Sequence, residues 1–430
     1  MNVIVNRTAV LHGKVTPPGS KSHSIRAILL ASLCNGTSVL NNILDSEDTR
    51  DAISACKTLG THIVEANNAI TITGTGTPLK LTTHEIHSGN SGITTHFLLP
   101  LLGLRNNTNQ AIILNCSDQM RARPITALLH ALKNLGLSFD SDVLPIKISG
   151  KLIGGKTEVD GTTSQYLSAL LLALPLAEKD SEIIVSNLQE RPYVEMTLDY
   201  LKKQNILYNH ENIGNKDMYK ITGRQAYKTF NHTIPSDFSS ASYLITAAVL
   251  IPGRVIIEGL DMNDTQGDKA LINLLITMGA DITIKSTTIV IQGGKKLTGI
   301  KIDASDIPDL LPVLAVIGTH ASGKTEIMNI QHARIKETDR IHSMSEGLSK
   351  LGAKIEENTD NLIVHNSTLK GCNLNGFGDH RTVMALSLAG LLASGVTQIT
   401  DSKAINKTYP DFISTMQSLG AKMEVAHELT

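Results

Sequence analysis

The sequence predicts an α/β fold of six repeated units of about 70 residues, because two independent markers recur with that spacing. The first marker is a helical pattern that closes with Leu-Gly or a close relative, at Gly60, Gly136, Gly279, Gly352 and Gly420, and more weakly at Asn205. Gly and Asn both accept the left-handed conformation that ends helices. The second marker is a small polar cluster before an apolar run, near Ser20, Asn90, Thr163, Asp237, Asp306 and Asp379.

Each unit is expected to contain two helices followed by strands. The first helix follows the polar cluster, as at Ser22–Leu33 and Gln165–Leu174, and the second ends at the glycine, as at Thr49–Leu59 and Arg123–Leu135. Most of the glycines are followed by short β-branched runs that alternate with period two, which predicts strands. Examples are Asp281–Lys285, Thr288–Gln292 and Asn361–His365. This local pairing differs from a Rossmann chain, where one helix separates successive parallel strands.

Composition excludes several classes of protein. Net charge is −1, from 39 basic and 40 acidic residues, aromatic residues make up 3%, and Trp is absent, which argues against nucleic-acid binding. No apolar run approaches the roughly 18 residues that cross a bilayer, and the first residues lack the order of a signal peptide. The four cysteines show no metal-binding spacing. We therefore expect a cytoplasmic protein with no membrane, nucleic-acid or metal partner.

One string imitates a nucleotide-binding loop. Residues 318–325, GTHASGKT, match the P-loop pattern, which requires a strand before it and a helix after it. Here a helix is expected before the string, at Leu310–Ile317, and a strand after it, at Thr325–Ile330. The string therefore indicates a helix-to-strand turn, and a P-loop kinase is retained only as an alternative that ATP binding would test.

Four short strings place charged groups at the starts of expected helices. They are PGSKSHSIR (18–26), RIKETDR (334–340), GDHR (378–381) and KTYPD (407–411). Helix starts expose N–H groups that favour anions, so the first helices of several units together suit a substrate with more than one phosphate or carboxylate. Taken singly, PGSKSHSIR and RIKETDR are equally typical of a capped helix with solvated charges, whereas the charges of GDHR, before the apolar run Val383–Leu392, are less easily explained as solvation.

Together, these strings resemble the 3-phosphoshikimate 1-carboxyvinyltransferases (EPSP synthases) of the enolpyruvyl transferase family. Further matching strings are GNSGITT (89–95), RARP (121–124), TTSQYLSAL (162–170), ERPYVEMTL (190–198), SDFSSASY (236–243) and IPD (307–309). They fall one or two to a unit along the whole chain. A related family, the UDP-N-acetylglucosamine carboxyvinyltransferases, is less similar, because it carries Lys-Asn where this chain has Lys21-Ser22 and a reactive Cys where this chain has Asp118.

The resemblance implies a two-domain inside-out α/β barrel of six βαβαββ units. One domain is expected at 20–233 and the other at 1–19 plus 234–430, with the active site in the cleft between them. The implied reaction moves the carboxyvinyl group of phosphoenolpyruvate to the 5-hydroxyl of shikimate 3-phosphate and releases phosphate. It belongs to the shikimate pathway of chorismate and aromatic amino acid biosynthesis. It needs no cofactor and no metal, and we expect a monomer.

Residue roles follow from the resemblance position by position. The implied catalytic residues are Asp309 as proton acceptor, Glu337 as proton donor, and Lys21. The implied contacts of shikimate 3-phosphate are Lys21, Ser22, Arg26, Thr163, Ser164, Gln165, Tyr193, Asp309, His332 and Lys336. Those of phosphoenolpyruvate are Lys21, Gly92, Arg123, Gln165, Arg340, His380, Arg381 and Lys407.

Four positions depart from the family pattern. His96 stands where Arg is usual, Ile93 replaces a usual Thr, Glu190 stands where a Ser commonly helps to hold the 3-phosphate, and His332 replaces a frequent Asn. An ionised Glu190 would repel a phosphate. Two alternatives therefore stay open: an enolpyruvyl transferase that acts on a variant acceptor, and a non-catalytic homologue.

Overall fold

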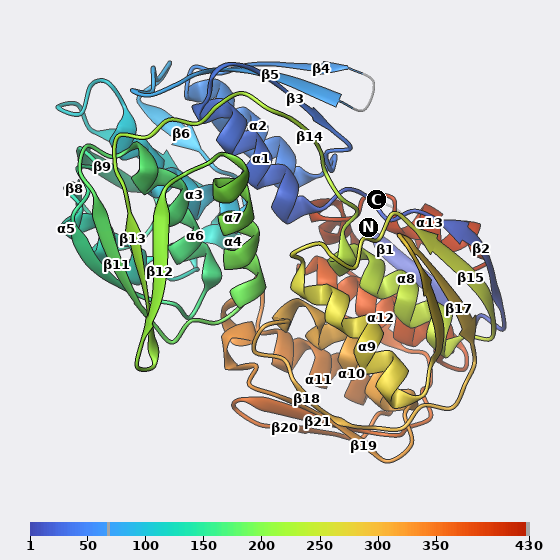
Figure 1. Ribbon diagram of the computed structural model, residues 1–430. Helices are drawn as coiled ribbons and strands as arrows, with labels where there is room; N and C mark the ends of the chain where they lie inside the picture. The colour runs from blue at the N-terminus through green and yellow to red at the C-terminus, as the bar shows by residue number, and fades with distance from the viewer. Residues whose placement is uncertain (67–68, 427–430) are drawn as a thin grey trace. The chain divides into compact units, whose positions relative to one another are not determined.

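The protein forms two compact lobes. The structure is a computed structural model that describes residues 1–66 and 69–426 (Figure 1), so the last four residues of the expected 234–430 domain lie outside the described residues. One lobe comprises Lys21–Ile234, and the other comprises Met1–Ser20 together with Pro235–Thr430. We call them the N-lobe and the C-lobe. Each has its own hydrophobic core.

The N-lobe contains three successive units. The first comprises α1 (Lys21–Leu33), β3 (Asn35–Asn41), α2 (Glu47–Thr58), β4 (His62–Ala66) and β5 (Ala69–Thr75), with β14 (Asn231–Thr233) added from the end of the lobe. The second comprises β6 (Glu85–His87), α3 (Gly92–Leu101), η1 (Leu102–Leu104), β7 (Ile112–Asn115), α4 (Asp118–Arg121), α5 (Thr126–Asn134), β8 (Leu137–Phe139) and β9 (Ile146–Gly150). The third comprises β10 (Lys156–Asp160), α6 (Ser164–Ala173), η2 (Leu174–Leu176), β11 (Ser181–Ser186), α7 (Arg191–Lys203), β12 (Tyr208–Ile213) and β13 (Lys216–Ile221).

The C-lobe repeats this plan. Its first unit comprises β2 (Leu11–Val15), α8 (Phe238–Leu250), β15 (Gly253–Glu258), η3 (Gly267–Lys269), α9 (Ala270–Met278), β16 (Asp281–Lys285) and β17 (Thr288–Gly293). The second comprises β18 (Lys301–Asp303), η4 (Pro308–Leu310), α10 (Leu311–His320), β19 (Lys324–Met328), η5 (Gln331–Ile335), α11 (Arg340–Lys350), β20 (Ile355–Glu357) and β21 (Asn361–His365). The third comprises β22 (Asn373–Leu374), α12 (His380–Leu392), β23 (Val396–Ile399), η6 (Ser402–Lys407), α13 (Phe412–Ser418), β24 (Met423–Ala426) and, from the other end of the chain, β1 (Asn2–Asn6).

Every unit forms one four-stranded sheet with the same pairing. In the order β10-β11-β13-β12, the first two strands are parallel and the other two pairs are antiparallel, with Val159 opposite Val185. The last C-lobe sheet reaches this arrangement by placing β1 between β23 and β24. Six such sheets confirm the predicted fold class of βαβαββ units.

The two helices of a unit differ in burial because they differ in amphipathicity. The first helices (α1, α3, α6, α8, α10 and α12) are apolar or small on nearly every face and are buried along almost their whole length. The second helices carry one apolar stripe and one polar face, as in α7 and α11. First helices pack against one another inside each lobe, as α3 does with α6 and α10 with α12. The N-terminal turns of these pairs lie close together, because Gly92 of α3 is near Gln165 of α6 and Arg381 of α12 donates to Asp309 just before α10.

Local predictions were mostly accurate. The glycines at 60, 136, 279, 352 and 420 all have positive φ, and Asn205 has φ 57°, which confirms the left-handed ends of the second helices. The GTHASGKT string spans the end of α10, a turn and the start of β19, so the helix-to-strand reading is confirmed. The helix predicted at Arg123–Leu135 begins only at Thr126, and Arg123 lies in an irregular segment after α4. Among the described residues, no helix is both long and apolar enough to cross a membrane.

Candidate active site

One cluster of charged side chains in the C-lobe is centred on Arg340, the first residue of α11. The Arg340 side chain is 1% exposed, and its guanidinium donates to three carboxylates. Nη1 donates to Asp309 Oδ1 at 2.7 Å, Nη2 to Glu337 Oε2 at 2.5 Å, and Nε to Asp379 Oδ2 at 3.0 Å. A single buried guanidinium thus joins carboxylates from three segments, and we call this group the Arg340 network.

Asp309 has a second cationic partner in Arg381. The Nη2 atom of Arg381 donates to Asp309 Oδ2 at 2.6 Å, so each carboxylate oxygen of Asp309 accepts from a different guanidinium. Burial raises the pKa of Asp309, but Arg381, Arg340 and Lys336 together lower it well below its usual value. Asp309 is therefore firmly ionised while it holds both arginines.

Asp379 fixes the network to the start of α12. As the N-cap residue it accepts from the backbone N–H groups of Arg381 and Thr382 at 3.4 Å each, and it also accepts from Arg340. Burial raises its pKa, while Arg340 and the adjacent His380 outweigh that effect and lower it. The expected free N–H groups at this helix start are thus partly satisfied by the protein's own carboxylate.

His380, another predicted C-lobe residue, begins α12, and three more lie in or beside short turns. Lys336 follows η5 and is close enough to Asp309 to lower its pKa. His332 lies within η5 and is 6% exposed. Lys407 ends η6 and is 4% exposed, unusually buried for a lysine.

In the N-lobe, Arg26 joins two helices, α1 and α7. It is 1% exposed and lies on α1. Its Nε donates to Thr197 Oγ1 at 2.9 Å, its Nη1 to the Ser22 carbonyl at 3.1 Å, and its Nη2 to the Tyr193 carbonyl at 3.1 Å. Burial lowers its pKa to about 10. These contacts tie α1 to α7 and give Arg26 a structural role; the contact with substrate stays a prediction.

Lys21 begins α1 and pairs with an aspartate that the sequence did not indicate. Its Nζ lies 3.0 Å from Asp48 Oδ2, with side chains 13% and 4% exposed respectively. Asp48 lies in the first turn of α2, where an acidic residue is also favoured by the helix dipole. The partner of Lys21 thus looks, in the sequence, like an ordinary helix-start residue.

Gly92, Arg123, Gln165 and His96 meet at the starts of α3 and α6. A methyl group on Gly92 would lie 2.4 Å from Arg123 Nη1 and 3.3 Å from Gln165 Oε1. His96 Nδ1 is 2.6 Å from the same Gln165 Oε1. The structure therefore brings together three residues predicted from separate strings, with a guanidinium directly against the Gly92 backbone. We call these four residues the Gly92 cluster.

The sequence of the chain is similar to those of known proteins. The EPSP synthase (3-phosphoshikimate 1-carboxyvinyltransferase) family model matches residues 5–416. The chain belongs to the EPSP synthase family. It is 42% identical to the 3-phosphoshikimate 1-carboxyvinyltransferase of Acetivibrio thermocellus over 96% of this chain and 97% of that one. It is 40% identical to that of Methanocaldococcus jannaschii over 98% and 99% of the two chains.

Solved structures of related proteins have the same fold as this chain. EPSP synthase from Acinetobacter baumannii superposes with a TM-score of 0.82 at 25% identity, covering 99% of this chain and 100% of that one. The enolpyruvyl transferase NikO from Streptomyces tendae, at 18% identity and a TM-score of 0.79, shares the fold. The prediction of an EPSP synthase family transferase of the shikimate pathway is confirmed.

The carboxylate of Glu190, which the resemblance implies to be a departure from the family pattern, lies at the start of α6. It accepts from Ser164 N at 3.2 Å and from Ser164 Oγ at 2.7 Å, and it is 2% exposed. Thr163, the N-cap of α6, accepts from Gln165 N. Two donors of Ser164, a predicted acceptor-binding residue, thus face an internal carboxylate. Ile93, another departure, is buried in the N-lobe core.

Two acidic residues of these clusters were missed from the predicted sites. Asp48 has no flanking string that distinguishes it, whereas Asp379 lies within GDHR and has the N-cap position as a readable signal. Among the described residues, no group of three or more His, Cys, Asp or Glu is placed to hold a metal ion.

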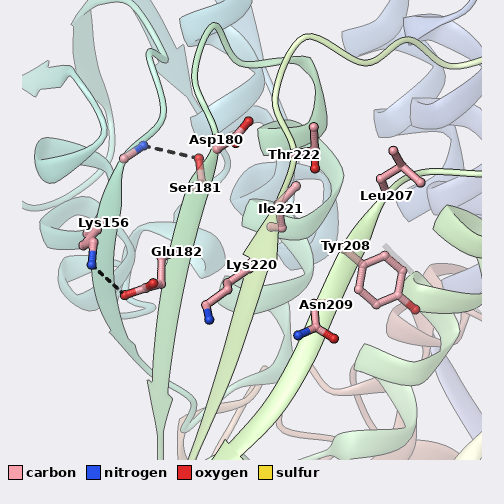
Figure 2. Close-up of a pocket in the computed structure, with 11 residues that line it drawn as sticks. Lys156, Asp180, Ser181, Glu182, Leu207, Tyr208, Asn209, Lys220, Ile221 and Thr222 are labelled. Carbon is pink, nitrogen blue, oxygen red and sulfur yellow. Dashed lines mark hydrogen bonds and ion pairs between the residues drawn. The ribbon is translucent and has the colours of Figure 1, made fainter.

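A hollow of about 620 Å³ lies elsewhere in the N-lobe, over the sheet β10-β11-β13-β12 (Figure 2). Lys156, Glu182, Lys220 and Tyr208 line it, and Lys156 pairs with Glu182 at 3.3 Å. No predicted site residue is among its lining residues. It therefore contributes nothing to the site described above.

Proposed function

We propose that the protein transfers the carboxyvinyl group of phosphoenolpyruvate to the 5-hydroxyl of shikimate 3-phosphate and releases phosphate. The observation that carries this proposal is the Arg340 network, in which one buried guanidinium holds both carboxyl groups that the reaction needs, Asp309 and Glu337. Protonation of the methylene carbon of phosphoenolpyruvate needs an acid, and addition of the 5-hydroxyl of shikimate 3-phosphate needs a base. Both groups must therefore lie close to the same reacting carbons.

The network supplies a way to activate Asp309. Phosphate and carboxylate groups are preferred bidentate partners of Arg, so phosphoenolpyruvate competes with Asp309 for Arg340 and Arg381. Each interaction that Asp309 loses raises its pKa toward the ordinary range, where it can accept a proton from the hydroxyl. Binding of phosphoenolpyruvate thus also makes Asp309 a stronger base.

Glu337 is the proposed proton donor. Its side chain is 10% exposed and lies within 2.5 Å of Arg340 Nη2. Displacement of this hydrogen bond by substrate likewise favours the protonated form of Glu337, because an opposite charge no longer stabilises its carboxylate. The contacts of Arg340 therefore influence the protonation of both the proposed acid, Glu337, and the proposed base, Asp309.

The N-lobe residues are proposed to act on the same two substrates. Lys21, Gly92, Arg123 and Gln165 are assigned to phosphoenolpyruvate. Thr163, Ser164, Tyr193, Ser22 and Arg26 are assigned to the acceptor, with His332 and Lys336 from the C-lobe. Arg340, Arg381 and Lys407 from the C-lobe are assigned to phosphoenolpyruvate as cationic groups, and His380 as a polar contact. Fixed positive charge of this kind stabilises phosphate and carboxylate in the transition state.

We also propose a cytoplasmic monomer. The four cysteines are free thiols, and three of them are buried, as suits a protein that needs no disulfide. Sedimentation equilibrium with and without both substrates would measure the mass of the particle, and a dimer in both conditions would overturn the monomer.

The test is release of phosphate from phosphoenolpyruvate. We expect release only when shikimate 3-phosphate is present, and we expect Glu337→Gln and Asp309→Asn to abolish it while the far-ultraviolet circular dichroism is retained. Glu346→Gln, on the exposed face of α11 where it pairs with Lys350, is the matched control and should stay active. Normal turnover by Glu337→Gln or Asp309→Asn would remove the role assigned to that residue.

One observation favours a second acceptor. The buried Glu190 carboxylate occupies the Ser164 donors, which is unfavourable for a phosphate at that point. Running the same assay with unphosphorylated shikimate decides this: faster turnover with shikimate than with its 3-phosphate identifies a variant acceptor. Absence of turnover with either acceptor would indicate a non-catalytic homologue.

A further inference from the structure

Two loops of the second C-lobe unit carry the proposed base and the proposed acid. One loop, residues 303–309, leads from the end of β18 to Asp309, and the other, residues 329–337, leads from the end of β19 to Glu337. We call them the base loop and the acid loop. The turn η4, where the base loop ends, lies next to η5, which is part of the acid loop. The separation of the two loops therefore affects how the base and the acid lie relative to each other.

A side-chain pair ties the first residues of the two loops together. Asn329 Nδ2 donates to Asp303 Oδ2 at 2.9 Å, and Asp303 Oδ1 accepts from Ser305 N at 3.0 Å. Burial raises the pKa of Asp303, but the hydrogen bonds from Ser305 and Asn329 outweigh this effect and lower it, so the carboxyl group is an ionised acceptor. One carboxylate thus closes the first turn of the base loop and binds the start of the acid loop.

The backbone alone does not explain an Asn at position 329. Asn329 has φ 60°, in the left-handed region that Gly adopts most readily and Asn less so. A Gly would therefore satisfy the turn, but it has no amide to donate to Asp303. The hydrogen bond is what the Asn side chain adds at this position.

The third N-lobe unit has the same pair at the same place. Asp160 ends β10 and accepts from Thr162 N at 2.8 Å, and Asn187, with φ 53°, follows β11 and donates from Nδ2 to Asp160 Oδ2 at 3.0 Å. The loop after Asp160 leads to Ser164, and the loop after Asn187 leads to Glu190. The side chains of Ser164 and Glu190 meet at 2.7 Å. In this unit too, the pair joins two loops that carry predicted or departing site residues.

The third C-lobe unit has the two residue types exchanged. In the register of the parallel strands, Asn375 and Asp401 take the places of Asp303 and Asn329. Asn375 Oδ1 accepts from Phe377 N at 2.7 Å, and Asp401 has φ 56°. The fold therefore accepts the amide first and the carboxylate second at these two positions.

We propose that Asp303–Asn329 and Asp160–Asn187 are positioning pairs, each of which fixes the separation of the two loops of its unit. This rests on the proposed function, which assigns proton transfer to the C-lobe loops and acceptor binding to the N-lobe loops. Misplacement of a reacting group by 1 Å costs about 100-fold in rate, so a hydrogen bond where the loops begin affects the reaction even though it contributes little to stability.

Replacement of each Asn by Gly removes the amide and keeps a residue suited to left-handed backbone. Asn329→Gly should lower kcat for phosphate release about tenfold, with KM for shikimate 3-phosphate within twofold of native, because the base and the acid are misplaced after the substrates have bound. Asn187→Gly should instead raise KM for shikimate 3-phosphate about fivefold, with kcat within twofold. The exposed Asn205, with φ 57°, gives the matched control: Asn205→Gly should leave kcat and KM unchanged. A purely structural role would lower thermal stability without separating kcat from KM in this way.

An exchange of residues tests the hydrogen bond itself. Asp303→Asn places an amide against the Asn329 amide, because its oxygen is held by Ser305 N, and Asn329→Asp places a second carboxylate against Asp303. Each single variant should therefore lose about tenfold in kcat. The double variant Asp303→Asn/Asn329→Asp restores one donor and one acceptor, in the order of Asn375 and Asp401, and its kcat should return to within twofold of native.

The outcomes separate the claims. Recovery of kcat in the double variant, together with the different effects of Asn329→Gly and Asn187→Gly, supports the inference. Native kinetics in either Gly variant overturns it for that unit, and a folded double variant that stays as slow as the single variants overturns it for the C-lobe pair, provided that Asp309→Asn is inactive. Normal activity of Asp309→Asn overturns the proposed function of Asp309, and the inference for the C-lobe pair with it.

Discussion

Replacement of Gly92 by Ala should weaken phosphoenolpyruvate binding through one contact. The added methyl group would lie 2.4 Å from Arg123 Nη1, whereas ordinary van der Waals contact begins at 3.4 Å, so the guanidinium must move by about 1 Å. A displacement of that size at a catalytic site typically costs about 100-fold in rate, or about 2.7 kcal/mol. The backbone itself tolerates the change for two reasons. Gly92 does not have a positive φ, and Ala has a higher helix propensity than Gly in α3, which Gly92 begins.

Steady-state phosphate release measures the effect. We expect kcat/KM for phosphoenolpyruvate to fall about 100-fold, mainly through KM, with no loss of thermal stability. A double-mutant cycle isolates the cause: if Gly92→Ala acts by displacing Arg123, the double variant with Arg123→Ala is no worse than Arg123→Ala alone. Additive losses, or a kcat/KM within threefold of the native value for Gly92→Ala, would refute the reasoning.

Three further predictions concern the buried charges. Arg26→Lys should lower the free energy of unfolding in urea by about 2–4 kcal/mol, because a lysine cannot reproduce the guanidinium contacts, whereas the exposed control Arg121→Lys should not. Glu190→Ser should lower KM for shikimate 3-phosphate about tenfold, or about 1.4 kcal/mol, by freeing Ser164; an unchanged KM would contradict this. The folded pKa values of Asp309 and Asp379 lie below the unfolded value, so they stabilise the fold above about pH 4. Their contribution is lost as the pH falls through the folded values, and urea unfolding from pH 6 to pH 2 should show stability falling with pH.

The repeat was readable from the sequence because its markers depend on local chemistry. A residue that ends a helix in the left-handed conformation is usually Gly and sometimes Asn, so the six helix ends could be read directly, down to Asn205. The start of α5 was placed too early for the same local reason: Pro124 resembles a first helical residue, but α5 begins at Thr126. A proline shows that a helix is near without showing its first residue.

The partners of the charged residues were not readable. Arg340 and Glu337 are three residues apart and belong to one string, but Arg340 also contacts Asp309 and Asp379, 31 and 39 residues away in sequence. Lys21 and Asp48 are separated by 27 residues, and only the fold of the first unit brings them together. A single sequence carries no record of such pairings, since each residue alone is compatible with a solvated surface position.

The two lobes use their buried arginines in different ways. Arg26 donates mainly to backbone carbonyls and a hydroxyl, neutral groups that no anionic substrate would displace without breaking the contact between α1 and α7. Arg340 and Arg381 instead donate to carboxylates, which carry the same sign of charge as the substrate. Exchange of one anion for another leaves these guanidiniums satisfied and changes chiefly the proton affinity of the carboxylates they release. The C-lobe arginines can therefore exchange their carboxylate partners during a reaction, whereas the contacts of Arg26 also hold α1 against α7.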